Sequence, residues 1–197
     1  MNIDTSNLLN SILEELSSLS YVHPGDVPNI DLYMDQVTTF MDEQLASTKR
    51  YPDDKILTKT MINNYAKNHL LPAPDKKKYS KEHLLLLIYI YYYKSILSIG
   101  DIQSLLEPLT QRYFHKDGEM NMQSIYEEVF SLEKEQVEKM KQDVTEKYET
   151  ASRIFPEAEA EDQEFLRIFS FICLLSFDVY VKKQVIEKLI DELPKKS

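Results

Sequence analysis

A stripe of polar and cationic residues at helical spacing is the part of the sequence best suited to chemistry. Lys59, Asn63 and Lys67 recur every four residues and Thr60 is next to them, so a helix here places all four on one side. An Asn amide can form paired hydrogen bonds with an adenine edge, and a Lys ammonium can contact phosphate or guanine. The stripe indicates a helix that reads a nucleic-acid groove, although an ordinary solvated helix face has the same pattern.

A second cationic group follows a segment that cannot be helical. The prolines of Leu71-Pro72-Ala73-Pro74 lack a backbone donor and restrict the residues before them, so the chain must turn there. We expect Lys76, Lys77 and Lys78 to project from this turn, where they could bind phosphates. His69, at the end of the preceding helix, could also touch phosphate. The competing interpretation is that these residues only solubilise an exposed turn and a helix end.

The charge distribution supports the first interpretation. The net charge of the 197 residues is -10, but residues 1–48 carry a balance of -8, residues 49–94 carry +6, and residues 95–197 carry -8. The only basic block therefore coincides with the stripe and the lysine run. A local positive field of this kind favours a polyanionic partner such as duplex DNA.

Hydrophobic periodicity predicts an all-α fold. Apolar residues recur at helical spacing in several segments separated by turn residues, and the stretch LLLLIYIYYY is apolar on all sides, which predicts the central helix of the core. Its tyrosines could line a ligand cavity, but a tyrosine-rich core is the more ordinary arrangement. The predicted helices cover residues 5–19, 30–46, a short third helix around 57–67, 80–95, 98–106, 121–154 and 163–193.

The middle of the chain resembles the DNA-binding half of mercury-resistance-regulator type (MerR-like) transcription factors. That family has a Thr-Leu-Arg-Tyr-Tyr helix, a Leu-Leu-Pro turn, an Arg-Tyr wing and a Phe-Ser-Leu-x-x-Ile helix start. The matching residues here are Ile62, Tyr65, Leu70-Leu71-Pro72, Lys78-Tyr79, and Leu97-Ser98-Ile99 with Ile102. The resemblance implies a winged helix-turn-helix, in which one helix enters the major groove and the wing contacts the backbone. MerR-like regulators dimerise through later helices, which implies a homodimer.

The chain departs from that pattern at several positions. Asn63-Asn64 replace the Arg-Tyr pair, His69 replaces the glycine before the turn, and only four residues separate Pro74 from Tyr79, so the wing is shortened. The whole chain is also similar to a bacterial family known only as a domain of unknown function, DUF1836. That likeness implies no activity.

Other classes of function find no support in the sequence. Three widely spaced glycines cannot form a glycine-rich phosphate loop, and the four histidines lack metal-ligand spacing. No nucleophile motif is present, so we expect no enzyme activity, no cofactor and no catalytic residue. The single cysteine, Cys173, lies in an apolar run and is predicted to be a buried thiol. With neither a signal peptide nor a membrane span recognisable, a cytoplasmic location is expected.

These observations predict three domains and one leading function. Residues 1–30 would form an acidic N-terminal helix, 31–110 a MerR-like unit, and 111–197 a helical domain for dimerisation or for receiving an unknown effector. The leading hypothesis is a DNA-binding transcriptional regulator whose contacts are Lys59, Thr60, Asn63, Lys67, His69, Lys76, Lys77 and Lys78. The alternatives are a protein-interaction module that kept the fold without DNA binding, and a small-molecule binder that uses the aromatic core.

Overall fold

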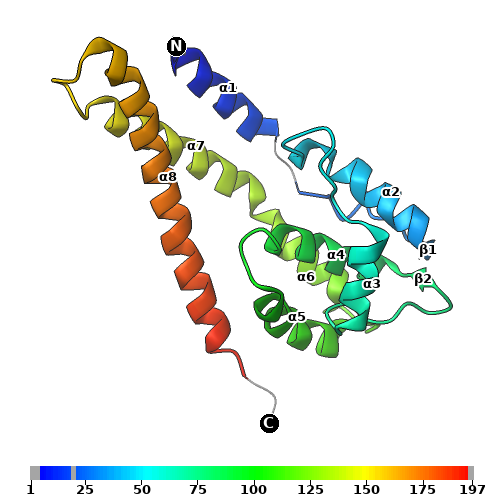
Figure 1. Ribbon diagram of the computed structural model, residues 1–197. Helices are drawn as coiled ribbons and strands as arrows, with labels where there is room; N and C mark the ends of the chain where they lie inside the picture. Colours follow the sequence, from blue (N-terminus) through cyan, green and yellow to red (C-terminus); the bar gives the residue numbers. More distant parts are fainter. Residues whose placement is uncertain (1–4, 19–20, 195–197) are drawn as a thin grey trace. The chain divides into compact units, whose positions relative to one another are not determined.

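The computed structural model describes residues 5–18 and 21–194 of the chain (Figure 1). The fold is all-α, as predicted, and its described residues contain a single pair of two-residue strands. The elements in chain order are α1 (Thr5–Ser18), β1 (Leu32–Tyr33), α2 (Met34–Gln44), a 3-10 turn (Ala46–Thr48), α3 (Lys59–Lys67), β2 (Lys78–Tyr79), α4 (Lys81–Tyr93), α5 (Ile99–Tyr113), α6 (Met122–Ser131), α7 (Glu133–Ser152) and α8 (Ala160–Asp191).

The chain divides into two compact units. The central unit contains the elements from β1 to α6, and the three-helix unit combines α1, α7 and α8 through Ile186. Along the chain, the boundaries between the units fall after Leu19, Ser131 and Ile186. The domain limits expected from the sequence, at residues 30 and 110, stay a prediction.

Helix α4 forms the core of the central unit. Every residue from His83 to Ile90 is buried, and α5, α6 and β2 all contact this helix (Figure 1). A helix can be apolar on all sides only when it is surrounded, so the predicted central position of this segment is confirmed. Buried Val37 and Met41 of α2, with Ile62 of α3, belong to the same set of fully enclosed apolar side chains.

The tyrosines of α4 pack against other rings. Tyr89 is buried and lies 5.5 Å from the ring of Tyr126, which in turn lies 4.2 Å from Phe130. The buried Tyr126 hydroxyl donates a 2.6 Å hydrogen bond to the Val22 carbonyl. Burial raises the pKa of Tyr89. These contacts are those of an aromatic core in which the buried Tyr126 hydroxyl is hydrogen-bonded.

Two predicted helix starts are confirmed by their caps. The backbone N–H of Asp101 donates to Ser98 Oγ (3.1 Å), and the Asp101 carboxylate accepts from the Ser98 N–H (3.2 Å). At the start of α4, the Ser80 N–H donates to Nδ1 of His83 (3.0 Å). Both motifs satisfy backbone donors that the first turn of a helix leaves unpaired.

Helix α5 is longer than its sequence predicts. We expect a stop near Leu106, before Pro108, but the helix continues to Tyr113 with the proline inside it. Thr110 Oγ1 donates to the Leu106 carbonyl (2.8 Å), and the Phe114 N–H donates to the Thr110 carbonyl (3.1 Å). Buried Ile102 and Leu106 anchor this helix on the core. The helix therefore continues beyond Pro108, although the proline removes one backbone donor.

The segment 121–154 is two helices rather than the predicted single one. Helix α6 ends at Ser131 and α7 begins at Glu133, and Leu132 between them is 58% exposed. The break falls where the apolar spacing lengthens to five residues, from Leu132 to Val137. Such a step rotates the apolar stripe away from its previous direction, so a continuous helix could not keep both halves on one core.

The three-helix unit has a small core of its own. Val144, Ala151 and Phe171 are buried, and the apolar side chains packed on them are Leu9, Ile12, Leu13, Leu16, Tyr148, Leu174 and Leu175. The apolar stripe of α1 therefore faces α7 and α8. Leu8 at the start of this helix is 41% exposed, and Leu19, the last residue of the predicted helix 5–19, lies outside the described residues.

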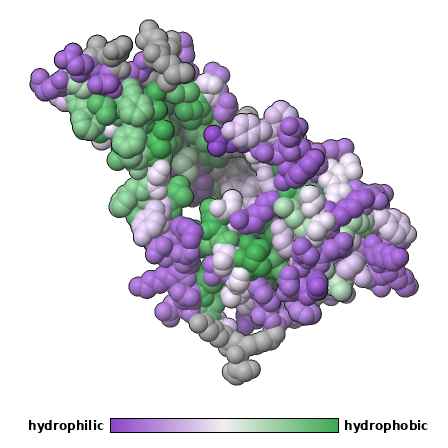
Figure 2. Space-filling model, viewed as in Figure 1, coloured by the Kyte–Doolittle hydropathy of each residue, from purple (hydrophilic) through white to green (hydrophobic). Residues whose placement is uncertain are grey.

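One face of α8 lacks such cover. Cys173 is exposed, so its predicted burial is wrong. The apolar run around Cys173 favours burial, but α7 packs on the side of α8 that carries Phe171, where the Tyr148 ring lies 5.6 Å away. Figure 2 shows hydrophobic residues, in green, gathered on the surface along this helix. None of the described helices is both long and apolar enough to cross a membrane.

Candidate nucleic-acid interface

Helix α3 turns the predicted polar stripe outward. Thr58 caps the helix by accepting a 3.2 Å bond from the Met61 N–H, and buried Ile62 and Tyr65 fix its inner face. The opposite face is exposed and carries four of the predicted contact residues together with Asn64: Lys59, Thr60, Asn63, Asn64 and Lys67. The predicted orientation of this helix is therefore confirmed.

The end of α3 places His69 in a conformation that favours glycine. The His69 N–H donates to the Ala66 carbonyl (3.2 Å), and the Leu70 N–H reaches back to the Tyr65 carbonyl (2.9 Å). These two bonds form a Schellman motif, whose residue after the cap is left-handed. His69 has a φ of 57° and its side chain is exposed beside a cavity of about 290 Å³ bordered by α5.

Replacing His69 with Gly should stabilise the fold by about 1 kcal/mol, because Gly has no Cβ to strain at positive φ. Urea unfolding followed by circular dichroism measures this. A matched His23→Gly variant, changed at an ordinary loop position, should gain nothing. Equal or lower stability of the His69 variant would contradict the assignment of strain to this residue.

The predicted lysines form a tight turn that we call the lysine turn, Asp75–Lys78. The Lys78 N–H donates to the Asp75 carbonyl (2.8 Å), and the two residues form a β-bridge. Lys76 and Lys77 have φ values of 46° and 67°. Positive φ at both central residues is typical of a type I′ turn, which normally takes Asn-Gly. Both lysines are exposed, so the turn displays two charges at strained positions.

The strand that pairs with the lysine turn comes from before α2. In the register of β1 and β2, Tyr33 lies opposite Lys78, and the Lys78 Nζ lies 5.4 Å from the centre of the Tyr33 ring. Asp35, two residues further on, forms an ion pair with Lys59 at the start of α3. The lysine turn and the first turn of α3 are thus both joined to residues 33–35.

The position of residues 33–35 beside the lysine turn and α3 does not follow from the sequence pattern. A strand of two residues carries no periodicity, so only the resemblance of Lys78-Tyr79 to a wing pointed to pairing there. Asp35 puts one negative charge next to Lys59, but both side chains are more than half exposed. Exposed pairs of this kind contribute little, so Lys59 can exchange Asp35 for a phosphate at small cost.

The structure therefore places all eight predicted contact residues in the central unit, in three different places. Lys59, Thr60, Asn63 and Lys67 share the outer face of α3, while Lys76 and Lys77 form the tip of the turn. His69 lies at the other end of α3, beside α5. Among the described residues, Lys67, Lys76 and Lys77 have no ion-pair partner, so their charges are available to an external anion.

Buried His83 supports the base of the lysine turn. Its ring makes an edge-on contact with Tyr79 of β2 (5.5 Å) and another with Phe114 (4.9 Å). Its Nδ1 accepts from the Ser80 N–H, which requires the neutral ring. Burial lowers the pKa of His83 from 6.5 to about 4, against the opposing effect of the Ala73 carbonyl.

This burial predicts a pH dependence of stability. The unfolded chain binds a proton at His83 with a pKa near 6.5 and the folded chain only near 4, so the free energy of unfolding should fall as the pH drops between these values. The loss is at most about 3 kcal/mol, and this group contributes no change above about pH 7. NMR titration of the His83 imidazole measures its pKa directly. A value near 6.5 in the folded protein would contradict the account.

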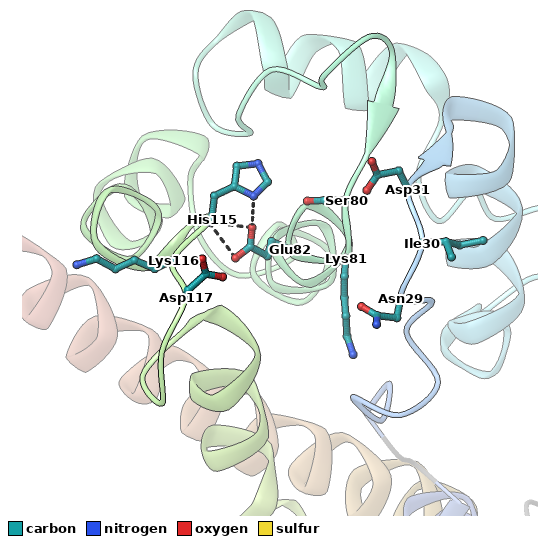
Figure 3. Close-up of a pocket in the computed structure, with 9 residues that line it drawn as sticks. All are labelled: Asn29, Ile30, Asp31, Ser80, Lys81, Glu82, His115, Lys116 and Asp117. Atoms are coloured by element: carbon teal, nitrogen blue, oxygen red, sulfur yellow. Dashed lines mark hydrogen bonds and ion pairs between the residues drawn. The ribbon is translucent and has the colours of Figure 1, made fainter.

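A pocket of about 450 Å³ lies at the start of α4 (Figure 3). In it the Glu82 carboxylate accepts the His115 N–H (2.8 Å) and pairs with His115 Nδ1 (2.7 Å). Lys81 and Lys116 point in different directions, and Asp31 and Asp117 also line the pocket. The pocket lining carries three acidic residues against two lysines, whereas the outer face of α3 carries Lys59 and Lys67 and no acidic residue.

The described residues contain no group of three or more His, Cys, Asp or Glu side chains that could hold a metal ion. The comparisons with known proteins give a family and nothing more. The model of a family described as a domain of unknown function (DUF1836) matches residues 22–129, which is more than half of the chain. No curated protein and no solved structure matches it.

Proposed function

The chain belongs to the DUF1836 family, and we propose that its family domain binds double-stranded DNA as a cytoplasmic transcriptional regulator. In this proposal α2 and α3 act as a MerR-like helix-turn-helix pair, and β1 with β2 and the lysine turn act as a shortened wing. The observation that carries the proposal is the outward face of α3, where Asn63 lies between Lys59 and Lys67 on a firmly anchored helix.

The dimensions of α3 suit a major groove. An α-helix with its side chains is about 10–12 Å across, and the major groove of B-DNA is about 12 Å wide. Ile62 and Tyr65 hold the helix on the core, so the outer face can enter the groove without rearrangement. Asn63 would read an adenine edge, and Lys59 and Lys67 would contact the flanking phosphates or a guanine.

The lysine turn supports the proposal by its conformation. Two exposed lysines with positive φ are costly to keep where Asn-Gly would form the same turn without strain. A requirement for positive charge at the tip explains why lysines occupy these two positions. Lys76 and Lys77 would then contact phosphates, and Lys78, held over Tyr33, would add a third contact at the base.

Binding to a random-sequence duplex tests the proposal through its dependence on salt. Five lysines at phosphates predict a slope of about -4.5 when log affinity is plotted against log salt concentration. Fluorescence anisotropy with a labelled duplex of about 20 base pairs measures this slope. A slope near zero, or no binding at low salt, would contradict the proposal.

The second candidate is a protein-interaction module that uses the same surface without DNA. The Asp35–Lys59 ion pair favours it, because an acid within the proposed interface repels a phosphate backbone. Under this alternative, Lys76 and Lys77 would bind an acidic protein surface instead. It predicts weak binding to every duplex, which the salt experiment separates from the first proposal.

A further inference from the structure

The Asp35–Lys59 ion pair joins the first turns of two helices. Asp35 lies in the first turn of α2, and Lys59 is the first residue of α3. The Asp35 side chain is 77% exposed and the Lys59 side chain is 59% exposed. Both charged groups are therefore accessible to an external ligand at the start of the outer face of α3.

The stability of α3 itself does not explain a lysine at this position. The N-terminus of a helix carries partial positive charge, so a cation there is unfavourable. Helix α3 has no acidic residue in its first turn to offset this effect. The partner of Lys59 comes instead from α2, where Asp35 suits the N-terminus of its own helix. The pair thus holds in place a lysine that α3 does not need for folding.

The pair presents a hydrogen-bond donor and an acceptor side by side. Pairing uses one of the three ammonium donors of Lys59 and one of the two carboxylate oxygens of Asp35. A G·C base pair offers the complementary groups in the major groove, because the O6 acceptor of guanine is next to the N4 donor of cytosine. Guanine N7, beside O6, can accept a second bond from Lys59.

We propose that Asp35 and Lys59 together read one G·C base pair, with Lys59 at the guanine and Asp35 at the cytosine. This inference rests on the proposed function, and it adds Asp35 of α2 to the residues that recognise bases. It also gives a role to an acid beside a DNA-contacting face. A carboxylate repels the phosphates of every sequence, but at cytosine N4 it accepts a hydrogen bond.

The same chemistry ranks the four base pairs at this position, written with the base at Lys59 first. C·G and A·T place an acceptor, O6 or O4, against the Asp35 carboxylate, so they should bind most weakly. T·A keeps the order of acceptor and donor, but it sets the thymine methyl group against the ammonium and adenine N7 against the carboxylate. G·C should therefore bind best and T·A second.

The geometry of α3 predicts where this base pair lies in the site. Lys59 and Asn63 are four residues apart, which is about 6 Å along a helix. Successive base pairs are about 3.4 Å apart. With α3 aligned along the groove, the G·C pair lies about two steps from the adenine that Asn63 contacts.

Fluorescence anisotropy with systematically altered duplexes tests the inference. The probe is the duplex that the full wild-type chain selects from a genomic library, with each base pair replaced in turn by the other three. Wild type should prefer G·C over C·G roughly 10-fold or more at one position about two steps from the adenine. Asp35→Asn should lose this preference, because an amide can donate or accept. It should also bind a random duplex more tightly, because an acid is gone.

The matched control is Asp42→Asn. Asp42 is an exposed acid on the same helix and also pairs with a lysine, Lys49, so its replacement removes the same charge. This variant should keep the preference for G·C. Loss of the preference in Asp42→Asn, or its persistence in a folded Asp35→Asn variant that still binds DNA, would overturn the inference and leave the proposed function standing. A wild-type chain that binds no duplex would overturn both.

A double-mutant cycle tests whether the two residues act as one reader. Lys59→Gln should lose the same preference as Asp35→Asn, and the double variant should lose no more than either single variant. Losses that simply add would mean that the residues read the site separately, which would contradict the joint contact. Urea unfolding should show nearly unchanged stability in all three variants, because an exposed ion pair contributes little to folding.

Discussion

Replacing Lys76 with Asn and Lys77 with Gly weakens binding to a random-sequence duplex about 50-fold at 0.1 M salt, if both lysines contact phosphates. Each lost contact reduces the salt slope by about 0.9, so the slope should fall by about 1.8. The variant cannot lose affinity by unfolding, because Asn-Gly is the preferred sequence of a type I′ turn. It should gain about 1 kcal/mol of stability. Anisotropy and urea unfolding on the same sample measure both effects.

The control for this variant removes the same charge elsewhere. Lys139 and Lys141 lie on α7, in the three-helix unit, where they pair with Glu135 and Glu138. Lys139→Gln/Lys141→Gln should leave the slope almost unchanged, because net charge alone acts weakly at a distance. Equal losses in the two variants, or no loss in the turn variant, would contradict a phosphate contact at the lysine turn.

Replacing Asn63 with Ala should act on sequence recognition instead. A paired hydrogen bond to an adenine edge contributes about 1–3 kcal/mol of discrimination, so affinity for a selected site should fall roughly 10-fold or more. Binding to a random duplex should change little, because Asn63 carries no charge. Since the side chain is exposed and Ala favours helix, folding should not suffer.

The matched variant for Asn63 is Asn10→Ala, which changes an exposed Asn on α1 in the other unit. It should change neither the affinity for the selected site nor the affinity for a random duplex. An Asn63 variant that weakens selected and random duplexes equally would assign the residue to backbone positioning and would contradict its role in base recognition.

The helical class and the orientation of α3 followed from local pattern because both depend on apolar spacing. The stripe of Ile62 and Tyr65 determines which side of α3 is buried, and the opposite stripe is then exposed. In the same way, the all-round apolarity of α4 required a central position. Periodicity predicts such features because burial of one face stabilises a helix more than propensity does.

Other features depend on contacts that local pattern does not contain. Pro108 stops a helix by local rules, but packing of Ile102 and Leu106 carries α5 past it. The hydropathy of its neighbours predicts that Cys173 is buried, but hydropathy does not distinguish a covered helix face from an exposed one. Tyr33 lies beside the lysine turn through a strand of two residues, too short to show alternation, and Asp35 pairs with Lys59 from the first turn of α2.

Selection of bound fragments from a genomic duplex library with the purified full chain, at about 0.1 M salt, tests the central claim most directly. The account predicts enrichment of one sequence that contains an adenine contacted through Asn63, and loss of that enrichment in Asn63→Ala. Recovery of no sequence above background by a folded protein would contradict the claim that the outer face of α3 reads DNA.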